Sequence, residues 1–200
     1  MPDKPFATAA ERNAASILEV LKQEFRDCSL VLEIGSGTGQ HSVLFAAALD
    51  HLDWQTSDLE TNHAAIRAWI ADATLPNVQP PLKLDVRTAV LTEGSYDGVF
   101  SCNTAHIMHF DAVVDMFGLV GRVLRQCGVF CLYGPFRKEG GYNTDSNEQF
   151  DRSLKSRDSG MGLRDLEALD ALGARNGLER TALFAMPSNN LLAVWRKVQI

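Results

Sequence analysis

The stretch VLEIGSGTGQHS, residues 31–42, decides how this chain folds. A nearly continuous apolar run leads into Gly35, Gly37 and Gly39, and an apolar helical pattern follows at once. An apolar run without alternation is typical of a parallel strand buried on both faces, and glycine permits a tight turn from strand to helix. Such a strand, loop and helix form a small-molecule site in many α/β folds. The stretch therefore predicts an α/β protein with a ligand site after this strand.

The rest of the chain repeats the alternation of strands and helices. Strands are expected at 30–34, 52–58, 82–86, 96–103 and 129–136, and helices at 13–25, 41–50, 64–73, 111–128, 147–156 and 163–177. Asn13 is expected to cap the first helix and Gly128 to close the helix over 111–128. The pair Pro80-Pro81 is expected to delay the third strand to residue 82.

This order predicts a mostly parallel sheet with helices on both faces. Residues 178–186 and 191–198 form a predicted closing hairpin around the turn PSNN, which adds an antiparallel strand. No linker long enough for a domain boundary interrupts the pattern, so residues 1–200 are expected to form a single domain.

Composition limits the partners. The formal net charge of −6 argues against nucleic acid or an anionic membrane surface, because both call for a basic protein. The four cysteines show no spacing typical of zinc, and we expect buried structural thiols and no metal site. The N-terminus lacks an apolar signal core and no apolar run is long enough to span a membrane. We therefore expect a cytoplasmic protein.

The spacing of the glycines limits the classes of ligand that the loop can bind. A dinucleotide fingerprint needs its third glycine at relative position 6, where this chain has Gln40. No GK[ST] follows, which excludes a P-loop. The remaining pattern, acid-x-Gly-x-Gly-x-Gly with Glu33 as the acid, is typical of Rossmann-like methyltransferases that use S-adenosylmethionine. The methionine carboxylate of that cofactor suits the backbone N–H groups at a helix N-terminus.

Two further acids end predicted strands. Asp58 ends the second strand, where a carboxylate can accept hydrogen bonds from both ribose hydroxyls. Asp85 ends the third strand beside Val86, at the expected place for adenine. Open α/β sheets bind ligands at the carboxyl ends of their strands. Three acids at successive strand ends therefore predict a bound S-adenosylmethionine.

Several motifs carry a family resemblance: AERN (10–13), LEIGSGTGQH (32–41), WQTSD (54–58), FSCNTAHI (100–107), LYGPF (132–136), SNEQFDRSL (146–154) and MPSNN (186–190). The chain resembles class I S-adenosylmethionine-dependent methyltransferases, in particular the methyltransferase-like protein 26 family. The resemblance implies a seven-stranded sheet whose last strand is antiparallel. It brings no established methyl acceptor.

The remaining candidates lie around the expected cleft. Asn103 follows the fourth strand and is a candidate both for cofactor binding and for catalysis, and His106 is the candidate general base. Arg12 and Asn13 open the first helix, where residues 1–28 are expected to cover the cofactor, and Arg12 could pair with its carboxylate. Residues 134–161 are expected to form an acceptor-side loop.

The leading hypothesis is therefore an S-adenosylmethionine-dependent methyltransferase with a small-molecule acceptor. A protein methyltransferase and a non-catalytic module that binds S-adenosylmethionine or S-adenosylhomocysteine are the alternatives. Oxygen, nitrogen and sulfur acceptors stay open, as does the oligomeric state.

Overall fold

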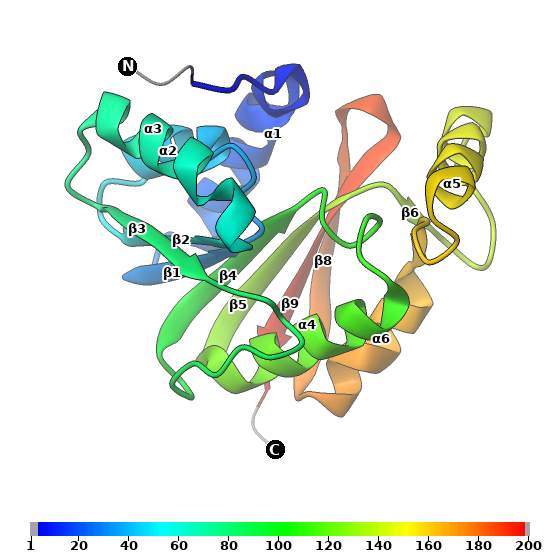
Figure 1. Ribbon diagram of the computed structural model, residues 1–200. Coiled ribbons are helices and arrows are strands. Elements are labelled where there is room, and N and C mark those ends of the chain that lie inside the picture. The colour runs from blue at the N-terminus through cyan, green and yellow to red at the C-terminus, as the bar shows by residue number, and fades with distance from the viewer. Residues whose placement is uncertain (1–3, 199–200) are drawn as a thin grey trace.

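A twisted sheet forms the centre of the molecule (Figure 1). The computed structural model describes residues 4–198, and within them the main sheet has 7 strands in the order β3-β2-β1-β4-β5-β9-β8. Strands β1 to β5 run parallel, whereas β9 pairs antiparallel with both β5 and β8. The strands are β1 (Leu30–Ile34), β2 (Asp53–Asp58), β3 (Val78–Lys83), β4 (Tyr96–Cys102), β5 (Leu124–Gly134), β8 (Leu178–Met186) and β9 (Asn190–Lys197). The predicted α/β fold with one antiparallel last strand is confirmed.

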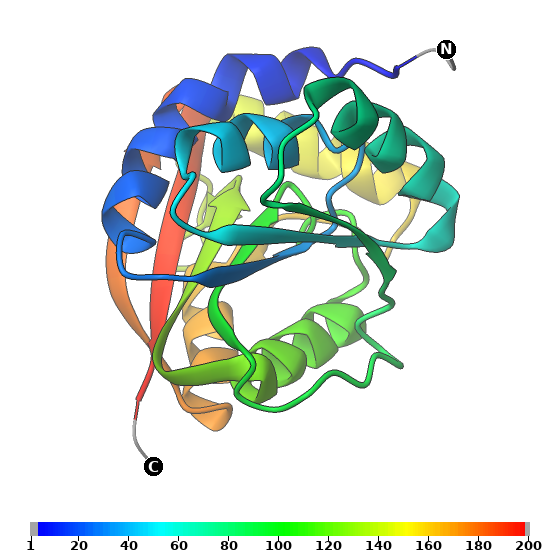
Figure 2. The ribbon, with the colours of Figure 1, turned by 90° about the vertical axis from the view of Figure 1, so that its left-hand side faces the viewer.

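Helices cover both faces of this sheet, as the two views show (Figures 1 and 2). One face carries α1 (Thr8–Glu24), α2 (Gln40–Ala48) and α3 (His63–Ala73), and the other carries α4 (Phe110–Val123) and α6 (Leu166–Arg175). Apolar residues of each layer pack on the sheet and form one hydrophobic core per face. The helix α5 (Asp145–Arg157) lies apart from the sheet, near the short parallel pair β6 (Phe136–Arg137) and β7 (Arg164–Asp165) (Figure 1). Two 3₁₀ turns, η1 (Glu60–Asn62) and η2 (Pro187–Asn189), complete the elements.

The strand order fixes where a ligand can bind. The chain leaves β1 toward β2 and β3 on one side, then crosses back to place β4 on the other side of β1. The carboxyl ends of β1 and β4 therefore diverge at a topological switch point, where open α/β sheets form a crevice. The glycine loop follows β1 at this point.

Of the expected buried thiols, Cys127 is exposed. Three predictions about element ends and caps were also wrong. The helix α4 ends at Val123, not at Gly128, because Leu124 turns to extended backbone and pairs with Tyr96 as the start of β5. Asn13 does not cap α1, which begins at Thr8, and its side chain is buried within that helix. The strand β3 includes Pro80 and Pro81, since it is an edge strand that pairs only with β2 and needs no second ladder.

The third strand ends at Lys83, so Asp85 and Val86 lie just beyond it. The segment 134–161 contains β6 and α5, and α5 spans the short helix predicted at 147–156. Within residues 4–198 no helix is both long enough and apolar enough to cross a membrane.

Candidate functional site

The glycine loop after β1 adopts a conformation that glycine favours. Gly35, Gly37 and Gly39 all have positive φ, at 77°, 59° and 86°. A Cβ on Gly39 would lie 2.9 Å from the backbone Cα of Ile66, so this glycine lets α2 pack closely on α3. A Cβ on Gly37 would meet no heavy atom within 4 Å. Gly37 thus presents open backbone, which a ligand can approach closely.

Asp58 ties the glycine loop to the end of β2. One carboxylate oxygen, Oδ2, accepts a hydrogen bond from the Gly37 amide at 2.7 Å. The other, Oδ1, accepts from the Leu59 amide at 2.7 Å and from Asn62 Nδ2 at 2.9 Å. These contacts fix the carboxylate at the mouth of the crevice. Asn62 was missed in the sequence, although its place four residues after Asp58 could have indicated this contact.

Glu33 supports the loop from inside the fold. Its side chain is 1% exposed, and its Oε2 accepts hydrogen bonds from Trp54 Nε1 at 3.0 Å, from Ser36 Oγ at 2.9 Å and from Ser42 Oγ. Burial raises the pKa of this carboxyl, against the opposing effect of the three donors. Glu33 therefore joins β1, β2, the loop and α2 at one buried point.

A cavity of about 540 Å³ opens at the carboxyl ends of β1, β2 and β4. Its lining combines acidic and apolar groups, including Gly37, Asp58, Leu59, Asp85, Val86, Asn103 and Ile107. The Asp85 carboxylate accepts hydrogen bonds from Arg87 Nε at 2.9 Å and Nη2 at 2.6 Å, and this contact lowers its pKa. The Arg87 partner was missed, although the short spacing in DVR was a usable signal.

A second cavity of about 220 Å³ adjoins the first under the start of α1. The two share Gly35, Gly37, Cys102 and Asn103 in their walls. Small side chains at the start of α1 line the second cavity, namely Ala9 and Ala10 of the helix and the preceding Ala7, together with Glu33 and His41. The two cavities are therefore neighbours at the glycine loop, and we call them together the cleft.

Hydrogen bonds hold the start of α1 over this cleft. The Ala7 amide donates to Gln40 Oε1 at 3.0 Å, and His41 Nε2 lies 3.1 Å from Ala10 O and 2.8 Å from Asn13 Oδ1. Burial lowers the pKa of His41 to about 4, so its ring is neutral at pH 7. Asn13 therefore faces α2 and holds α1 there, whereas Arg12 is exposed and lines neither cavity.

Asn103 and His106 lie around the end of β5. Asn103 has a positive φ of 57°, and its backbone N–H donates a hydrogen bond to Tyr133 O at 2.9 Å. A Cβ on Gly134 would lie 3.6 Å from His106 Nδ1 and 4.0 Å from Asn103 Oδ1, so both side chains approach this glycine. The ring of Phe150, from α5, packs edge-on against His106 at 5.4 Å. The structure thus brings the two catalytic candidates together beside Gly134. Asn103 lines both cavities, whereas the buried His106 lines neither.

The charge state of His106 follows from its surroundings. Burial lowers the pKa of His106 to about 4, with a further contribution from the charges of Arg164 and Arg157. The ring is therefore neutral at pH 7 and can accept a hydrogen bond. Within residues 4–198 no group of three or more His, Cys, Asp or Glu side chains is placed to hold a metal ion.

Comparison with known proteins identifies the family of this chain and structures with a similar fold. The model of the family described as "Protein of unknown function (DUF938)" matches residues 4–197, and the chain belongs to this family. The structure is similar to an O-methyltransferase family protein from Burkholderia thailandensis, with a TM-score of 0.82 and 15% identity over 96% of this chain and 58% of that one. PigF, solved with SAH, gives a TM-score of 0.77 at 17% identity over 95% and 64% of the chains.

The match to YcgJ from Bacillus subtilis has a TM-score of 0.73 and 15% identity, and it covers 95% of this chain and 100% of that one. Two of the other similar structures are the mitomycin 7-O-methyltransferase MmcR and the S-adenosylmethionine-dependent methyltransferase SibL, of which this chain spans 55% and 56%. At these identities the likeness concerns the fold. The chain therefore has the methyltransferase fold, in a length little more than half that of several of these proteins.

Proposed function

We propose that this protein is an S-adenosylmethionine-dependent methyltransferase that acts on a small molecule. The observation that carries the proposal is the cleft at the switch point, where two cavities meet over Gly37 and Asn103. Its shape and polarity suit a ligand with a nucleoside at one end and an amino acid at the other. The similar structures that are named as methyltransferases support the same reading.

The nucleoside belongs in the larger cavity. Asp58 is proposed to accept hydrogen bonds from the ribose hydroxyls, since its carboxylate is already fixed at the cavity wall. Asp85 and Val86 are proposed to meet the adenine, and Arg87 then holds the Asp85 carboxylate in place. Leu59 and Ile107 supply apolar wall for a planar base.

The amino-acid end belongs in the smaller cavity. Gly35 and Gly37 line this cavity, and the N-terminus of α2 beside them suits a carboxylate, because backbone N–H groups at a helix start favour negative charge. Glu33 lines this cavity as well. Residues 1–28 are proposed to act as a cover, in which Asn13 positions α1 through His41; residues 1–3 of that cover lie outside the described residues. Arg12 could reach the carboxylate only if its exposed side chain turned inward.

The acceptor is proposed to bind beside Gly134, between the cleft and the segment 134–161. When bound, the cofactor supplies a methyl group activated by a sulfonium. The protein must then orient the acceptor and, where needed, accept its proton. Asn103 is proposed to orient the acceptor or the cofactor, and the neutral His106 to accept a hydrogen bond from the acceptor.

Kinship with the methyltransferase-like protein 26 family and a cytoplasmic location belong to the same proposal. The motifs of the acceptor side, FSCNTAHI, LYGPF and SNEQFDRSL, support the kinship. A basic peptide as acceptor would also suit the net charge of −6. A small molecule is favoured because Phe150 of α5 packs against His106 and covers it.

Thermal unfolding with S-adenosylmethionine, S-adenosylhomocysteine or NAD tests the cofactor. A ligand at 100 times its dissociation constant stabilises the protein by ~2.7 kcal/mol. We expect a higher Tm with both sulfur compounds and no change with NAD. A rise with NAD alone would refute the proposal. Incubation with a methyl-labelled cofactor and fractionated metabolites then separates an enzyme from a non-catalytic binding module, which would bind without transfer.

A further inference from the structure

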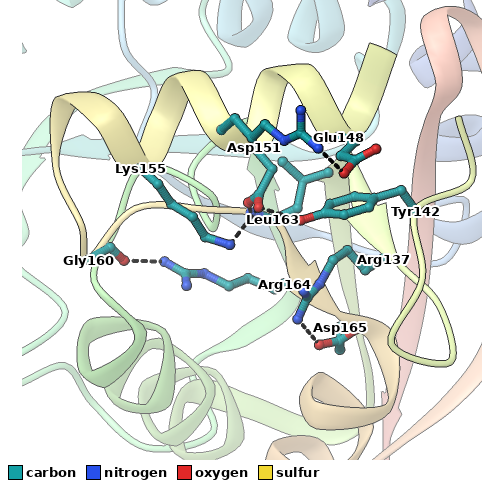
Figure 3. Close-up of polar contacts among 10 residues, drawn as sticks. Arg137, Tyr142, Glu148, Asp151, Lys155, Gly160, Leu163, Arg164 and Asp165 are labelled. Atoms are coloured by element: carbon teal, nitrogen blue, oxygen red, sulfur yellow. Dashed lines mark hydrogen bonds and ion pairs between the residues drawn. The ribbon is translucent and has the colours of Figure 1, made fainter. Parts of the chain in front are cut away.

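A short segment after α5 holds the back of the cofactor cleft. Arg164, on β7, donates from Nε to Ala105 O at 2.9 Å and from Nη2 to Gly160 O at 2.9 Å, and its Nη2 also contacts Met108 O. The Gly162 amide donates to His106 O at 2.9 Å. Figure 3 shows Arg164 extended toward Gly160, below Lys155. Three carbonyls of the segment 105–108 are thus satisfied from residues 162–164.

These carbonyls belong to a single helical turn. The amides of Ile107 and Met108 both donate to Thr104 O, at 3.0 and 3.1 Å. A turn that does not continue as a helix leaves carbonyl groups without partners at its end, and an arginine side chain can satisfy several of them. Residues Thr104, Ile107 and Met108 also line the larger cavity, whereas Arg164 does not. Arg164 therefore lies behind the cavity wall and binds the turn that forms it.

Arg164 differs from its charged neighbours in its partners. Arg137 pairs with Asp165, and Lys155 pairs with the buried Asp151 (Figure 3). Within residues 4–198, Arg164 forms no ion pair with a carboxylate, and its side chain donates to backbone carbonyls only. Its guanidinium is half-buried, and burial lowers its pKa. The cost of burying this charge is met by charge-assisted hydrogen bonds to the turn, so the contact is specific to the turn's geometry.

The helix α5 holds residues 162–164 in place through Asp151. The buried Asp151 carboxylate accepts hydrogen bonds from the Leu163 amide at 2.7 Å and from Tyr142 Oη at 2.7 Å. A Cβ on Gly162 would lie 2.8 Å from Asp151 Oδ1, so the chain passes directly against this carboxylate. The position of Arg164 is therefore set by α5, in the acceptor-side segment.

We propose that Arg164 is a positioning residue for the cofactor cavity, which it shapes by clamping the turn Thr104–Met108. The proposal rests on the proposed function, since it assigns the cavity to S-adenosylmethionine. It gives a reason for arginine at this position, because the planar fork spans several carbonyls and the lysine ammonium cannot. It also connects the acceptor-side segment to the wall of the cofactor site through one side chain.

The test compares Arg164→Ala and Arg164→Lys with Arg180→Ala as a control. Arg180 is also half-buried and binds one partner, Asp170, but it lies on β8 away from both cavities. Affinity for S-adenosylhomocysteine is measured by calorimetry, and amide hydrogen exchange of Ile107 and Met108 is followed in the free protein. Because Arg164→Ala could unfold the protein, Arg164→Lys serves as the milder variant.

We expect Arg164→Ala to raise the Kd for S-adenosylhomocysteine roughly tenfold and to speed exchange at Ile107 and Met108. Arg164→Lys should change the Kd and the two exchange rates less than Arg164→Ala does. Arg180→Ala should lower the Tm and leave the Kd and the exchange rates unchanged. An unchanged Kd in the Arg164 variants, or unchanged exchange, would overturn the positioning role. If the wild type fails to bind S-adenosylhomocysteine, the proposed function fails instead, and the exchange data still decide whether Arg164 clamps the turn.

Discussion

Replacement of Gly37 by alanine separates binding from folding. Gly37 has φ of 59°, and alanine in this left-handed region costs roughly 1–2 kcal/mol. The new Cβ meets no protein atom within 4 Å, so no steric clash adds to this cost. For a protein of this length the Tm should fall by roughly 2–8 °C. The new methyl group enters the space that both cavities share.

The same methyl group should obstruct the cofactor. Adding a methyl group to a space that a ligand fills closely costs roughly 1–3 kcal/mol of binding free energy. At a concentration of S-adenosylhomocysteine that stabilises the wild type by ~2.7 kcal/mol, Gly37→Ala should therefore gain less than ~1.8 kcal/mol. Thermal unfolding without ligand measures the loss of stability, and thermal unfolding with S-adenosylhomocysteine measures the stabilisation by the ligand.

Gly94→Ala is a closely matched control. Gly94 has φ of 58°, and a Cβ there also meets no atom within 4 Å, but it lines neither cavity. The Tm of Gly94→Ala should fall by as much as that of Gly37→Ala. S-adenosylhomocysteine should stabilise Gly94→Ala as much as it stabilises the wild type. If Gly37→Ala binds S-adenosylhomocysteine as tightly as Gly94→Ala, the cofactor does not lie over the glycine loop and the reasoning is wrong.

Three further predictions follow from the contacts of the cleft. Asp58→Ala leaves the Gly37 and Leu59 amides without partners and should cost about 1–3 kcal/mol of stability as well as cofactor affinity, which calorimetry measures. Asn13→Ala removes the contact with His41 and should speed dissociation of S-adenosylhomocysteine in stopped-flow experiments; an unchanged rate would show that α1 does not cover the ligand. The pKa values of His41 and His106 fall from 6.5 to about 4 on folding, so the unfolded chain binds more protons between these pH values. Stability should therefore be full above pH 6.5 and decline toward pH 4, by up to about 3 kcal/mol per histidine; a denaturation series in His41→Gln and His106→Gln should show a shallower decline.

The grouping of the cofactor-binding candidates around the cleft could be predicted from local sequence, and their binding of a cofactor stays a prediction. Asp58 ends a strand. Gly35, Gly37, Gly39, Asp85 and Val86 follow one, and all six residues line the cleft or shape its loop. This worked because parallel strands bring their carboxyl ends to one edge, so a one-dimensional pattern specifies a shared location. The prediction that Asn13 caps the first helix was wrong, because a helix can begin several residues before its first apolar position.

The contacts behind the site could not be predicted in this way. Arg164 is 56 residues from Met108 in sequence, and the carbonyls that it binds carry no side-chain signal. The end of α4 was missed because Leu124 suits a helix as well as a strand, and its pairing with Tyr96 across the sheet decides between them. The two prolines in β3 were misjudged because only the strand order shows that β3 is an edge.

The sequence by itself determined the alternation of strands and helices, the glycine loop and the acids at the strand ends. These features depend on residues close together in the chain, where backbone propensity and hydrophobic periodicity act. Only the tertiary structure decided the strand order, the two-part cleft over Gly37, the burial that keeps His41 and His106 neutral, and the clamp from Arg164. Each of these depends on which distant segments exclude water from one another, and that is settled only when the chain has packed.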